Sequence, residues 1–306
     1  MSIHLLALPV RVVDLHEDIG YWYSRGLNFE SGDAPSTLEK LSKLEDAVVV
    51  SIIFPATGRG RYDLTLQTLI TQLKYFHVLE MQGKVRIVRG RDDLRSRGVK
   101  LVIGVEGTDA LSDPNDLLWL HETGVRVVGL SWNYGTKFAA SCMSKKDYGL
   151  TDLGEELVRL ANEIGVLIDV SHASRQASLE AASVSRRPVI ATHSNALALK
   201  QHPRNLDDET LRALARTGGV IGITSIPDTL PDPSVKGMAE VARYVGELVG
   251  WEHVALGTDF LGLERYPAGF SDLSDLGALA ELLGPRADDV LWRNAMRVLE
   301  ESLPQR

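Results

Sequence analysis

The stretch VVDLHED, residues 12 to 18, combines the pattern of a strand with side chains that bind metals. Its apolar, β-branched residues predict a strand buried on both faces. Alternation at a period of two puts Asp14, His16 and Asp18 on one face. Imidazole nitrogen and carboxylate oxygen together suit a cation such as zinc. Alone, the stretch also fits a histidine and two acids at a solvated strand end, so further ligands must come from elsewhere.

Composition describes an ordinary soluble globular chain. Its 306 residues are 44% hydrophobic and 24% charged, enough for one large barrel or two medium domains. The net charge of -8 argues against nucleic acid or an anionic membrane as the main partner, because both need a basic surface. Cys142 is the single cysteine, which excludes an internal disulfide and a cysteine-rich zinc site and predicts a free buried thiol.

The sequence carries none of the usual targeting signals. Residues 1–15 lack a basic leader, and no apolar run approaches the roughly 20 residues that cross a bilayer. Residues 298–306 are polar, unlike the hydrophobic tail of a lipid-anchor signal. We therefore expect a cytoplasmic protein.

Apolar strand-like runs alternate with helical segments along the chain, with no linker or short repeat, which predicts a single domain over residues 1–306. Strong strands are expected at residues 12–18, 47–54, 101–107, 125–133, 166–172, 188–193, 220–226 and 253–260. Helices are expected at residues 36–44, 64–82, 91–98, 113–124, 151–165, 174–185, 207–219, 235–250, 274–283 and 288–303. Residues 85–90 form a short extra strand or edge piece, and loops follow the first two strands.

Eight strands, each followed by helix, predict an α/β fold of the (β/α)8 TIM barrel type. Six polar residues end five of the strands, on the face where such barrels place their active sites: His16, Asp18, Glu106, His172, His193 and Asp259. A doubly wound open sheet is the structural alternative, because strand counting does not show closure.

Three imidazoles and three carboxylates at strand ends can hold two divalent cations, and Glu106 is the candidate that bridges them. Scatter along the chain would not select five strand ends on one face. The other five histidines fall elsewhere in the pattern and are interpreted as structural or solvated: His4, His77, His121, His202 and His253.

Over nearly its whole length the sequence resembles the membrane (renal) dipeptidase family of zinc metallopeptidases, which have amidohydrolase-like barrels. The most specific block runs through GLTDLGEELVRLANEIGVLIDVSHAS and PVIATHSNALALKQHPRNLDDETLRALARTGGVIGI. Shorter marks are VDLHED, GVEG, HVALGTDF and NAMRVLE.

The resemblance implies two zinc ions per chain. By position, His16 and Asp18 would bind one ion, His172 and His193 the other, and Glu106 would bridge them. A water shared by the two ions would be acidified to a hydroxide and attack the amide carbonyl. Glu106 is therefore counted among the catalytic residues.

The resemblance also assigns residues that handle protons and substrate. Asp259 would take the proton from the attacking water and return it to the leaving amine. Arg204, in the sequence HPRN, would hold the substrate carboxylate through its planar fork, although a surface or helix-capping arginine is the alternative. Asp14 and Asp169 are candidates to orient a ligand by hydrogen bonding, or are structural.

Departures from the family pattern concern the substrate pocket. Where the family commonly has a histidine that polarises the scissile carbonyl, this chain has Trp132. Asn133 could donate a hydrogen bond in its place, or Trp132 could form a pocket wall. After Asp259 the family often has a second acid, whereas Phe260 and Leu261 follow here. The chain is also shorter than many members, so its pocket loops are expected to be trimmed.

We therefore predict a binuclear zinc dipeptidase that acts on small dipeptides with a free C-terminal carboxylate. The resemblance implies tolerance of a D-residue on the C-terminal side and suggests a homodimer. A second hypothesis keeps the site but changes the substrate to an N-acyl amino acid, another small amide or a lactone. A third is a non-catalytic barrel with a binding or maturation role.

Overall fold

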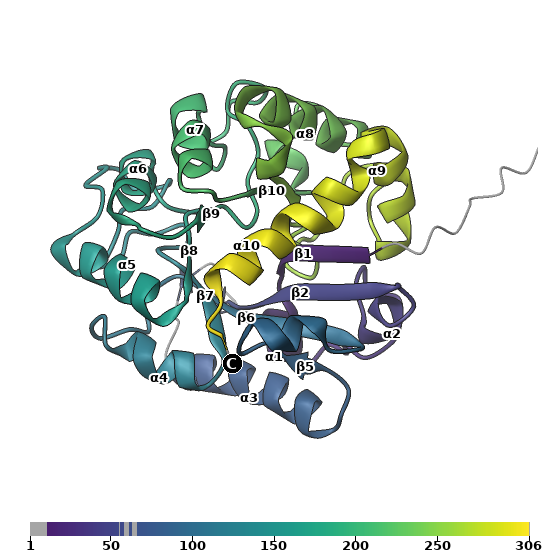
Figure 1. Cartoon of the computed structure of the whole chain (residues 1–306), viewed down its shortest axis with the longest axis horizontal. Helices are drawn as coiled ribbons and strands as arrows, with labels where there is room; N and C mark the ends of the chain where they lie inside the picture. Colours follow the sequence, from purple (N-terminus) through teal and green to yellow (C-terminus); the bar gives the residue numbers. More distant parts are fainter. Residues whose placement is uncertain (1–10, 55, 58–60, 63–65, 306) are drawn as a thin grey trace, which may run out of the picture.

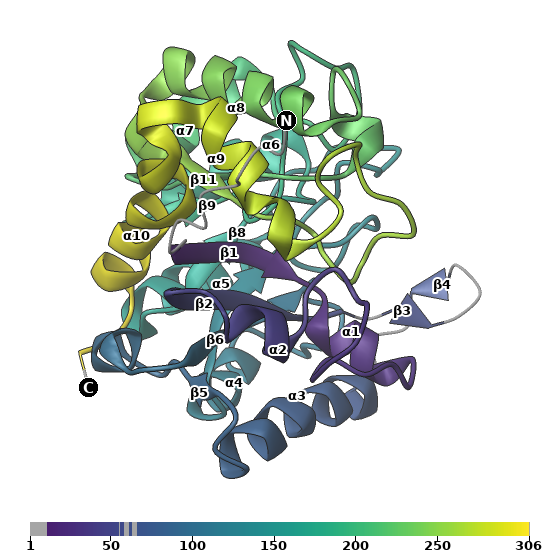
Figure 2. The same ribbon diagram turned by 90° about the vertical axis from the view of Figure 1, so that its right-hand side faces the viewer.

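The computed structural model describes residues 11–54, 56–57, 61–62 and 66–305, and these form a barrel of parallel strands surrounded by helices (Figures 1 and 2). The barrel strands, in spatial order, are β10 (Ile221–Ile223), β11 (Val254–Leu256), β1 (Arg11–Glu17), β2 (Asp46–Ile53), β6 (Val99–Glu106), β7 (Val125–Gly129), β8 (Leu167–Asp169) and β9 (Val189–Ile190). A parallel bridge between Ala191 and Ile221 connects β9 back to β10. The predicted (β/α)8 barrel is confirmed, and the open sheet is not observed.

Helices cover the outer face of the barrel (Figure 1). They are α1 (Ile19–Ser24), α2 (Leu38–Leu41), α3 (Leu66–Met81), α4 (Asp116–Glu122), α5 (Asp152–Ile164), α6 (Arg175–Val184), α7 (Asp208–Arg216), α8 (Val235–Val249), α9 (Leu276–Leu283) and α10 (Asn294–Ser302). Several begin where the sequence provides a cap: the side chains of Thr151, Ser174 and Asp207 each accept a hydrogen bond from a first-turn amide. No helix among the described residues is long and apolar enough to cross a membrane.

Strand alternation divides the core into two clusters. In β2, Val48 and Val50 belong to one cluster, whereas Ala47 and Val49 belong to the other. The first cluster also contains Met296 and Leu299 of α10, the helix that crosses in front of the strands in Figure 1. Both faces of the strands are therefore buried, as parallel sheets require.

Several local predictions differ from the structure. The segment after the first strand was predicted as a loop but contains α1, whose short apolar turn packs near α3. The loop predicted after β2 contains a two-stranded ribbon of β3 (Ala56–Thr57) and β4 (Arg61–Tyr62), with its remaining residues outside the described ones. The helix predicted at 91–98 is the 3₁₀ turn Arg91–Arg95. The last predicted helix starts with a π turn, Asp289–Arg293, before α10.

The edge strand predicted at residues 85–90 is present as β5 (Arg86–Ile87), which pairs with β6 outside the barrel path.

Five strands, β7 to β11, end three or four residues earlier than the sequence pattern indicated. β8, β9 and β11 stop three residues before His172, His193 and Asp259, so these side chains lie on loops just beyond the strands. The cause is competition for backbone amides. The Asp169 carboxylate accepts the N–H groups of Ser171 and Thr192, which would otherwise continue the strand ladders.

Two glycines allow the backbone to close around Thr192. A Cβ added to Gly222 would lie 2.0 Å from the carbonyl oxygen of Thr192, and one added to Gly257 would lie 1.7 Å from the same atom. Both distances are far inside van der Waals contact, and the clashing atom is backbone. Only glycine therefore permits β10 and β11 to approach the end of β9 this closely.

We predict that Gly222→Ala destabilises the protein by about 1 to 3 kcal/mol, because the added methyl group forces the strands apart at the barrel closure. Thermal unfolding followed by circular dichroism measures the change. Gly129→Ala is the matched control, since its Cβ meets the nearest atom, the Gly107 nitrogen, at 3.3 Å. Equal melting temperatures for the two variants would contradict this account of the closure.

Candidate metal centre

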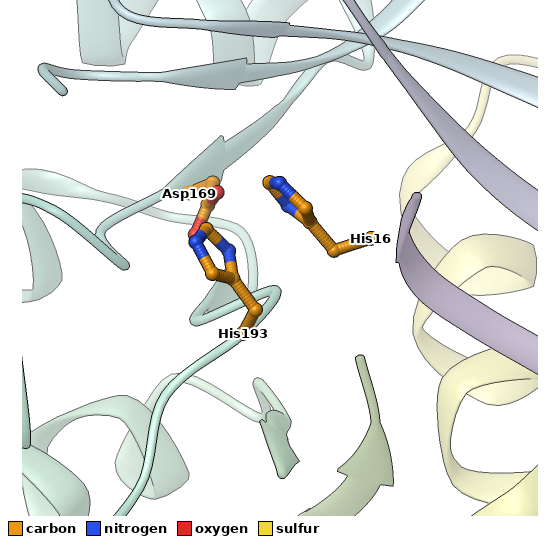
Figure 3. A group of neighbouring side chains, drawn as sticks. All are labelled: His16, Asp169 and His193. Carbon is orange, nitrogen blue, oxygen red and sulfur yellow. The ribbon is translucent and has the colours of Figure 1, made fainter. Parts of the chain in front are cut away.

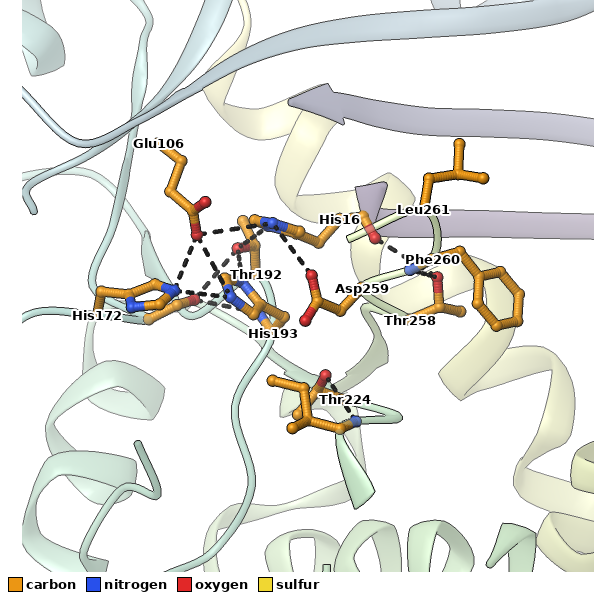
Figure 4. Close-up of polar contacts among 12 residues, drawn as sticks. His16, Glu106, His172, Thr192, His193, Thr224, Thr258, Asp259, Phe260 and Leu261 are labelled. Atoms are coloured by element: carbon orange, nitrogen blue, oxygen red, sulfur yellow. Dashed lines mark hydrogen bonds and ion pairs between the residues drawn. The ribbon is translucent and has the colours of Figure 1, made fainter. Parts of the chain in front are cut away.

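Three imidazole nitrogens converge on one carboxylate oxygen at the mouth of the barrel (Figure 4). The Nε2 atoms of His172, His193 and His16 lie 2.9, 3.5 and 3.7 Å from Oε1 of Glu106. The Nε2 atoms of His172 and His193 are 3.1 Å apart. Ligands of a tetrahedral zinc ion, each about 2.1 Å from the metal, lie about 3.4 Å from one another. The distances between these atoms therefore match those between ligand atoms that bind the same metal ion.

Two overlapping groups of ligand atoms share Glu106. One consists of Glu106, His172 and His193, and the other of His16, Asp18 and Glu106, with the atoms of each group within 4.8 Å of one another. Asp18 follows β1 directly, and a Cβ on Gly262 would lie 2.0 Å from its carboxylate. Glycine at this position therefore leaves room for Asp18. The structure brings together all five residues that the sequence predicted as metal ligands.

The chemistry of the donors fits a divalent cation. Among the described residues, His16 Nε2, Asp18 Oδ1 and Glu106 Oε1 are buried atoms without a hydrogen-bond partner. A buried polar atom without a partner costs free energy, and a buried carboxylate costs more. A cation among these atoms would offset that cost.

The pKa shifts of these residues also favour a bound cation. Burial, with a contribution from the positive charge of Arg204, lowers the pKa values of His16, His172 and His193 well below 6.5. The imidazoles are therefore neutral near pH 7, the form that binds metals. Burial and then the charge of nearby Asp259 raise the pKa of the Asp18 and Glu106 carboxyls well above their usual range. A bound cation would favour their ionised form.

Asp259 lies beside His16 in an uncommon backbone conformation. Its φ of 63° is in the left-handed region, which residues other than glycine seldom adopt. Its amide donates to the His16 carbonyl at 3.0 Å, and its Oδ1 lies 3.8 Å from His16 Nε2. Burial raises the pKa of Asp259 to about 7, against the opposing effects of Asp18 and Arg204. The next residue, Phe260, is fully buried and stacks on Phe270. It is therefore part of the hydrophobic core in this chain, at the point where the family often has a second acid.

Arg204 is buried between the metal-ligand loops and a cavity. Its guanidinium donates to the backbone carbonyls of Ser171 and, at 3.3 Å, His193. It also lines a cavity of about 230 Å³, which includes Cys142 and His202 in its wall. The guanidinium carries five N–H donors, so it can bind a carboxylate in the cavity while holding the loops. This placement excludes the surface arginine considered from the sequence.

Trp132 and Asn133 both lie beside the His172 ring. The Trp132 ring is 6.0 Å from the His172 ring and packs edge-on against Phe54 at 4.9 Å, so it forms an aromatic wall. Asn133 Oδ1 accepts a hydrogen bond from His172 Nδ1 at 2.9 Å. The Asn133 oxygen therefore orients a predicted ligand, a role that the sequence did not indicate.

The two aspartates predicted to orient ligands differ in what they contact. Asp14 accepts the backbone N–H of His16 at 3.1 Å and the hydroxyl of Thr258 at 2.6 Å, so it shapes the strand rather than the imidazole ring. The register shifts by one residue just after Asp14, which interrupts the strict alternation predicted for β1. Asp169 reaches the imidazoles through the Thr192 hydroxyl, and no local sequence pattern indicated this role for Thr192.

The remaining histidines have mostly structural contacts. His77 Nε2 and His253 Nδ1 bond backbone carbonyls of Thr123 and Gly219 at 2.9 and 2.7 Å. His121 pairs with the neighbouring Glu122, and His4 lies outside the described residues. His202 Nδ1 accepts the Arg204 amide at 3.2 Å, and its side chain lines the Arg204 cavity.

A (β/α)8 barrel with a buried cluster of imidazoles and carboxylates at the carboxyl ends of its strands has the architecture of a barrel metallohydrolase. The family model of membrane dipeptidase, peptidase family M19, matches residues 2–304. The chain therefore belongs to the membrane dipeptidase family.

Relatives in sequence include proteins named as dipeptidases. "Dipeptidase verJ" of Clonostachys rogersoniana is 30% identical over 77% of this chain and 65% of its own length. "Dipeptidase aclJ" of Aspergillus oryzae is 33% identical over 66% of this chain and 51% of its own. A Klebsiella pneumoniae protein described by its position in the pqqA 5' region is 34% identical over 70% and 85%. The chain thus spans between half and two thirds of the two fungal dipeptidases.

Solved structures share the fold over almost the full chain. A metallopeptidase described as dipeptidase AC superimposes with a TM-score of 0.85, 24% identity and coverage of 97% of this chain and 99% of that one. A metallopeptidase of Rhodobacter sphaeroides, solved with a phosphinate mimic of L-Ala-D-Ala, has a TM-score of 0.84, 22% identity and coverage of 96% and 99%. These likenesses support the barrel assignment.

We predict that the metal-free protein loses stability as the pH rises from about 7.5 to about 9. Above about pH 7.5, His16, His172 and His193 are neutral in the folded state and largely neutral in the unfolded state, where a histidine has a pKa of about 6.5. The buried acids, including Asp259 with its pKa near 7, are still partly protonated in the folded state and ionised in the unfolded state. The folded state therefore binds more protons, and its stability falls as they are lost.

The melting temperature of chelator-treated protein, measured across that range, tests this prediction. Added zinc should abolish the decline, because a cation favours the ionised carboxylates. Asp259→Asn should reduce the decline in the metal-free protein, because the titrating group is gone. A metal-free melting temperature that rises between the two pH values would contradict the prediction.

Proposed function

We propose that this protein is a binuclear zinc dipeptidase that hydrolyses the peptide bond of dipeptides with a free C-terminal carboxylate. The observation that carries the proposal is the convergence of three Nε2 atoms on one oxygen of Glu106. Membership of the membrane dipeptidase family supports it. Arg204 is buried and donates to the backbone carbonyl of His193, one of the predicted metal ligands, which supports the requirement for a carboxylate.

Five residues would hold the two ions. His16 and Asp18 would hold the first, His172 and His193 the second, and Glu106 both. Zinc suits this mixture of nitrogen and oxygen donors. When bound, a zinc pair supplies an acidified water and positive charge that stabilises the developing oxyanion.

Asp259 would move the proton. Its carboxylate lies within 3.8 Å of a ligand atom of the first ion, and its pKa of about 7 suits both removal and return of a proton near neutral pH. The left-handed backbone at Asp259 fixes where the carboxylate points. It would accept a proton from the attacking water and donate it to the leaving amine.

Arg204 and the aromatic wall would position the substrate. The guanidinium would bind the C-terminal carboxylate through two parallel hydrogen bonds. Trp132, next to the His172 ring, would pack against the substrate side chain. The Rhodobacter relative in fold was solved with a mimic of L-Ala-D-Ala, and we extend tolerance of a D-residue on the C-terminal side to this chain.

Trp132 also favours a second candidate function. In place of the histidine common in the family, it offers an apolar surface beside the reaction centre. An N-acyl amino acid, with its apolar acyl group and free carboxylate, would use both Trp132 and Arg204, and other small amides or lactones are further candidates. A non-catalytic barrel remains the third hypothesis. Cytoplasmic location and a homodimer are retained as proposals.

Metal analysis combined with a substrate screen tests the proposed function. We expect two zinc ions per chain and turnover of L-L and L-D dipeptides that stops on chelation and returns with zinc. Glu106→Gln should lower the affinity for both ions. Full activity without metal would refute the mechanism, and turnover of acylated amino acids alone would favour the second candidate. Bound zinc without any turnover would favour the third.

We predict that Arg204→Ala lowers kcat/KM for dipeptides roughly 10- to 100-fold, about 1.4 to 2.8 kcal/mol, mainly by raising KM. Dipeptide amides, which lack the carboxylate, provide the comparison, because the loss on them should be small. Arg204→Lys keeps the charge without the fork and should lie between the two. An equal loss on dipeptides and their amides would indicate that Arg204 only supports the loops.

A further inference from the structure

The Thr192 hydroxyl lies at the centre of a buried hydrogen-bond cluster, on the side of the imidazoles away from Glu106. Its Oγ1 is 2.9 Å from His16 Nδ1, 2.9 Å from His193 Nδ1 and 2.7 Å from Asp169 Oδ2. Thr192 is fully buried. Figure 3 shows the two rings and Asp169 gathered together, and Figure 4 shows Thr192 between the rings.

The same three residues form a group with metal-ligand spacing, His16, Asp169 and His193. The Thr192 hydroxyl already lies within hydrogen-bond distance of one atom of each of these residues. Their arrangement is therefore explained by Thr192 and needs no third ion.

The number of protons decides the direction of each bond. A carboxylate only accepts hydrogen bonds, so the single proton of the Thr192 hydroxyl goes to Asp169. The Ser171 hydroxyl, 3.1 Å from Thr192 Oγ1, gives its own proton to Asp169 Oδ1 at 2.6 Å. The two lone pairs of Thr192 Oγ1 then accept from the Nδ1–H groups of His16 and His193.

A neutral imidazole carries one proton. With that proton on Nδ1, both rings present an unprotonated Nε2 on the opposite side, toward Glu106. The two ring planes are tilted by 40° with their centroids 3.6 Å apart, and one oxygen reaches both Nδ1 atoms.

We propose that Thr192 is a positioning residue whose single hydroxyl sets the tautomer and orientation of one ligand of each metal ion. The proposal rests on the binuclear centre of the proposed function. His16 belongs to the first ion and His193 to the second, so Thr192 couples two sites that otherwise share only Glu106. His172 is positioned separately, by Asn133.

Thr192→Val tests the proposal because valine keeps the shape and removes the hydroxyl. We expect the affinity for each of the two zinc ions to fall about 10- to 100-fold, the usual effect of removing a group that orients a ligand. Competition with a chromophoric chelator measures both dissociation constants, and the absorption spectrum of the cobalt-substituted protein should change. Thr192→Ser, which restores the hydroxyl, should return both affinities to within a few-fold of wild type.

Thr258→Val is the matched control. Thr258 is also a buried threonine that gives its hydroxyl proton to an aspartate, Asp14, and its amide to the same carboxylate. Its hydroxyl oxygen accepts the Phe260 amide rather than an imidazole. We expect Thr258→Val to leave both zinc affinities near wild type, which separates ligand positioning from a general loss of a buried hydrogen bond.

Nitrogen NMR of the metal-free wild-type protein gives a test that needs no variant. His16 and His193 should both show the Nδ1–H tautomer, and an Nε2–H tautomer in either would overturn the proposal. Unchanged zinc affinities in Thr192→Val, loss at one site only, or failure of Thr192→Ser to restore binding would also overturn it. The NMR and variant results named above would overturn only the role of Thr192 and would not affect the proposed function. A wild-type protein that binds no metal would refute the proposed function as well.

Discussion

Carboxylates buried together at the mouth of the barrel impose the main physical constraint on this structure. Asp18, Glu106 and Asp259 are each less than a tenth exposed, and the positive charge of Arg204 lowers the pKa values of Glu106 and Asp259 against the larger effect of burial. Like charges at such distances raise one another's pKa and destabilise the ionised form. Divalent cations would relieve this repulsion, which explains why three neutral imidazoles are directed at the same point.

Two aspartates beneath this cluster organise the strand ends. Asp14 and Asp169 each accept the backbone amide two residues ahead and both the amide and hydroxyl of a threonine across the sheet. Each carboxylate thereby turns the chain away from the ladder and begins the loop that carries a functional side chain. The two arrangements differ at the threonine hydroxyl, because only the threonine bonded to Asp169 also contacts imidazoles.

Much of the fold and the candidate site was predictable from local pattern. Buried strands and capped helices alternate visibly, and glutamate or histidine at strand ends marks the catalytic face of a barrel. The roles of Thr192 and Asn133 were not predictable. Their neighbours along the chain are His193 and Trp132, but their hydrogen-bond partners lie up to 176 residues away. Nothing in a local pattern distinguishes these polar residues from others in loops.

The sequence by itself determined which side chains could bind metal and that parallel strands would bring them to one edge, because side-chain alternation and helix capping are local properties. The tertiary structure alone decided where each strand stops, which way Asp14 and Asp169 bond, and which ring nitrogen faces Glu106. Those outcomes depend on competition for the same amides, protons and lone pairs by residues far apart in the chain. Barrel closure around Thr192 is what brings these competitors within hydrogen-bond distance.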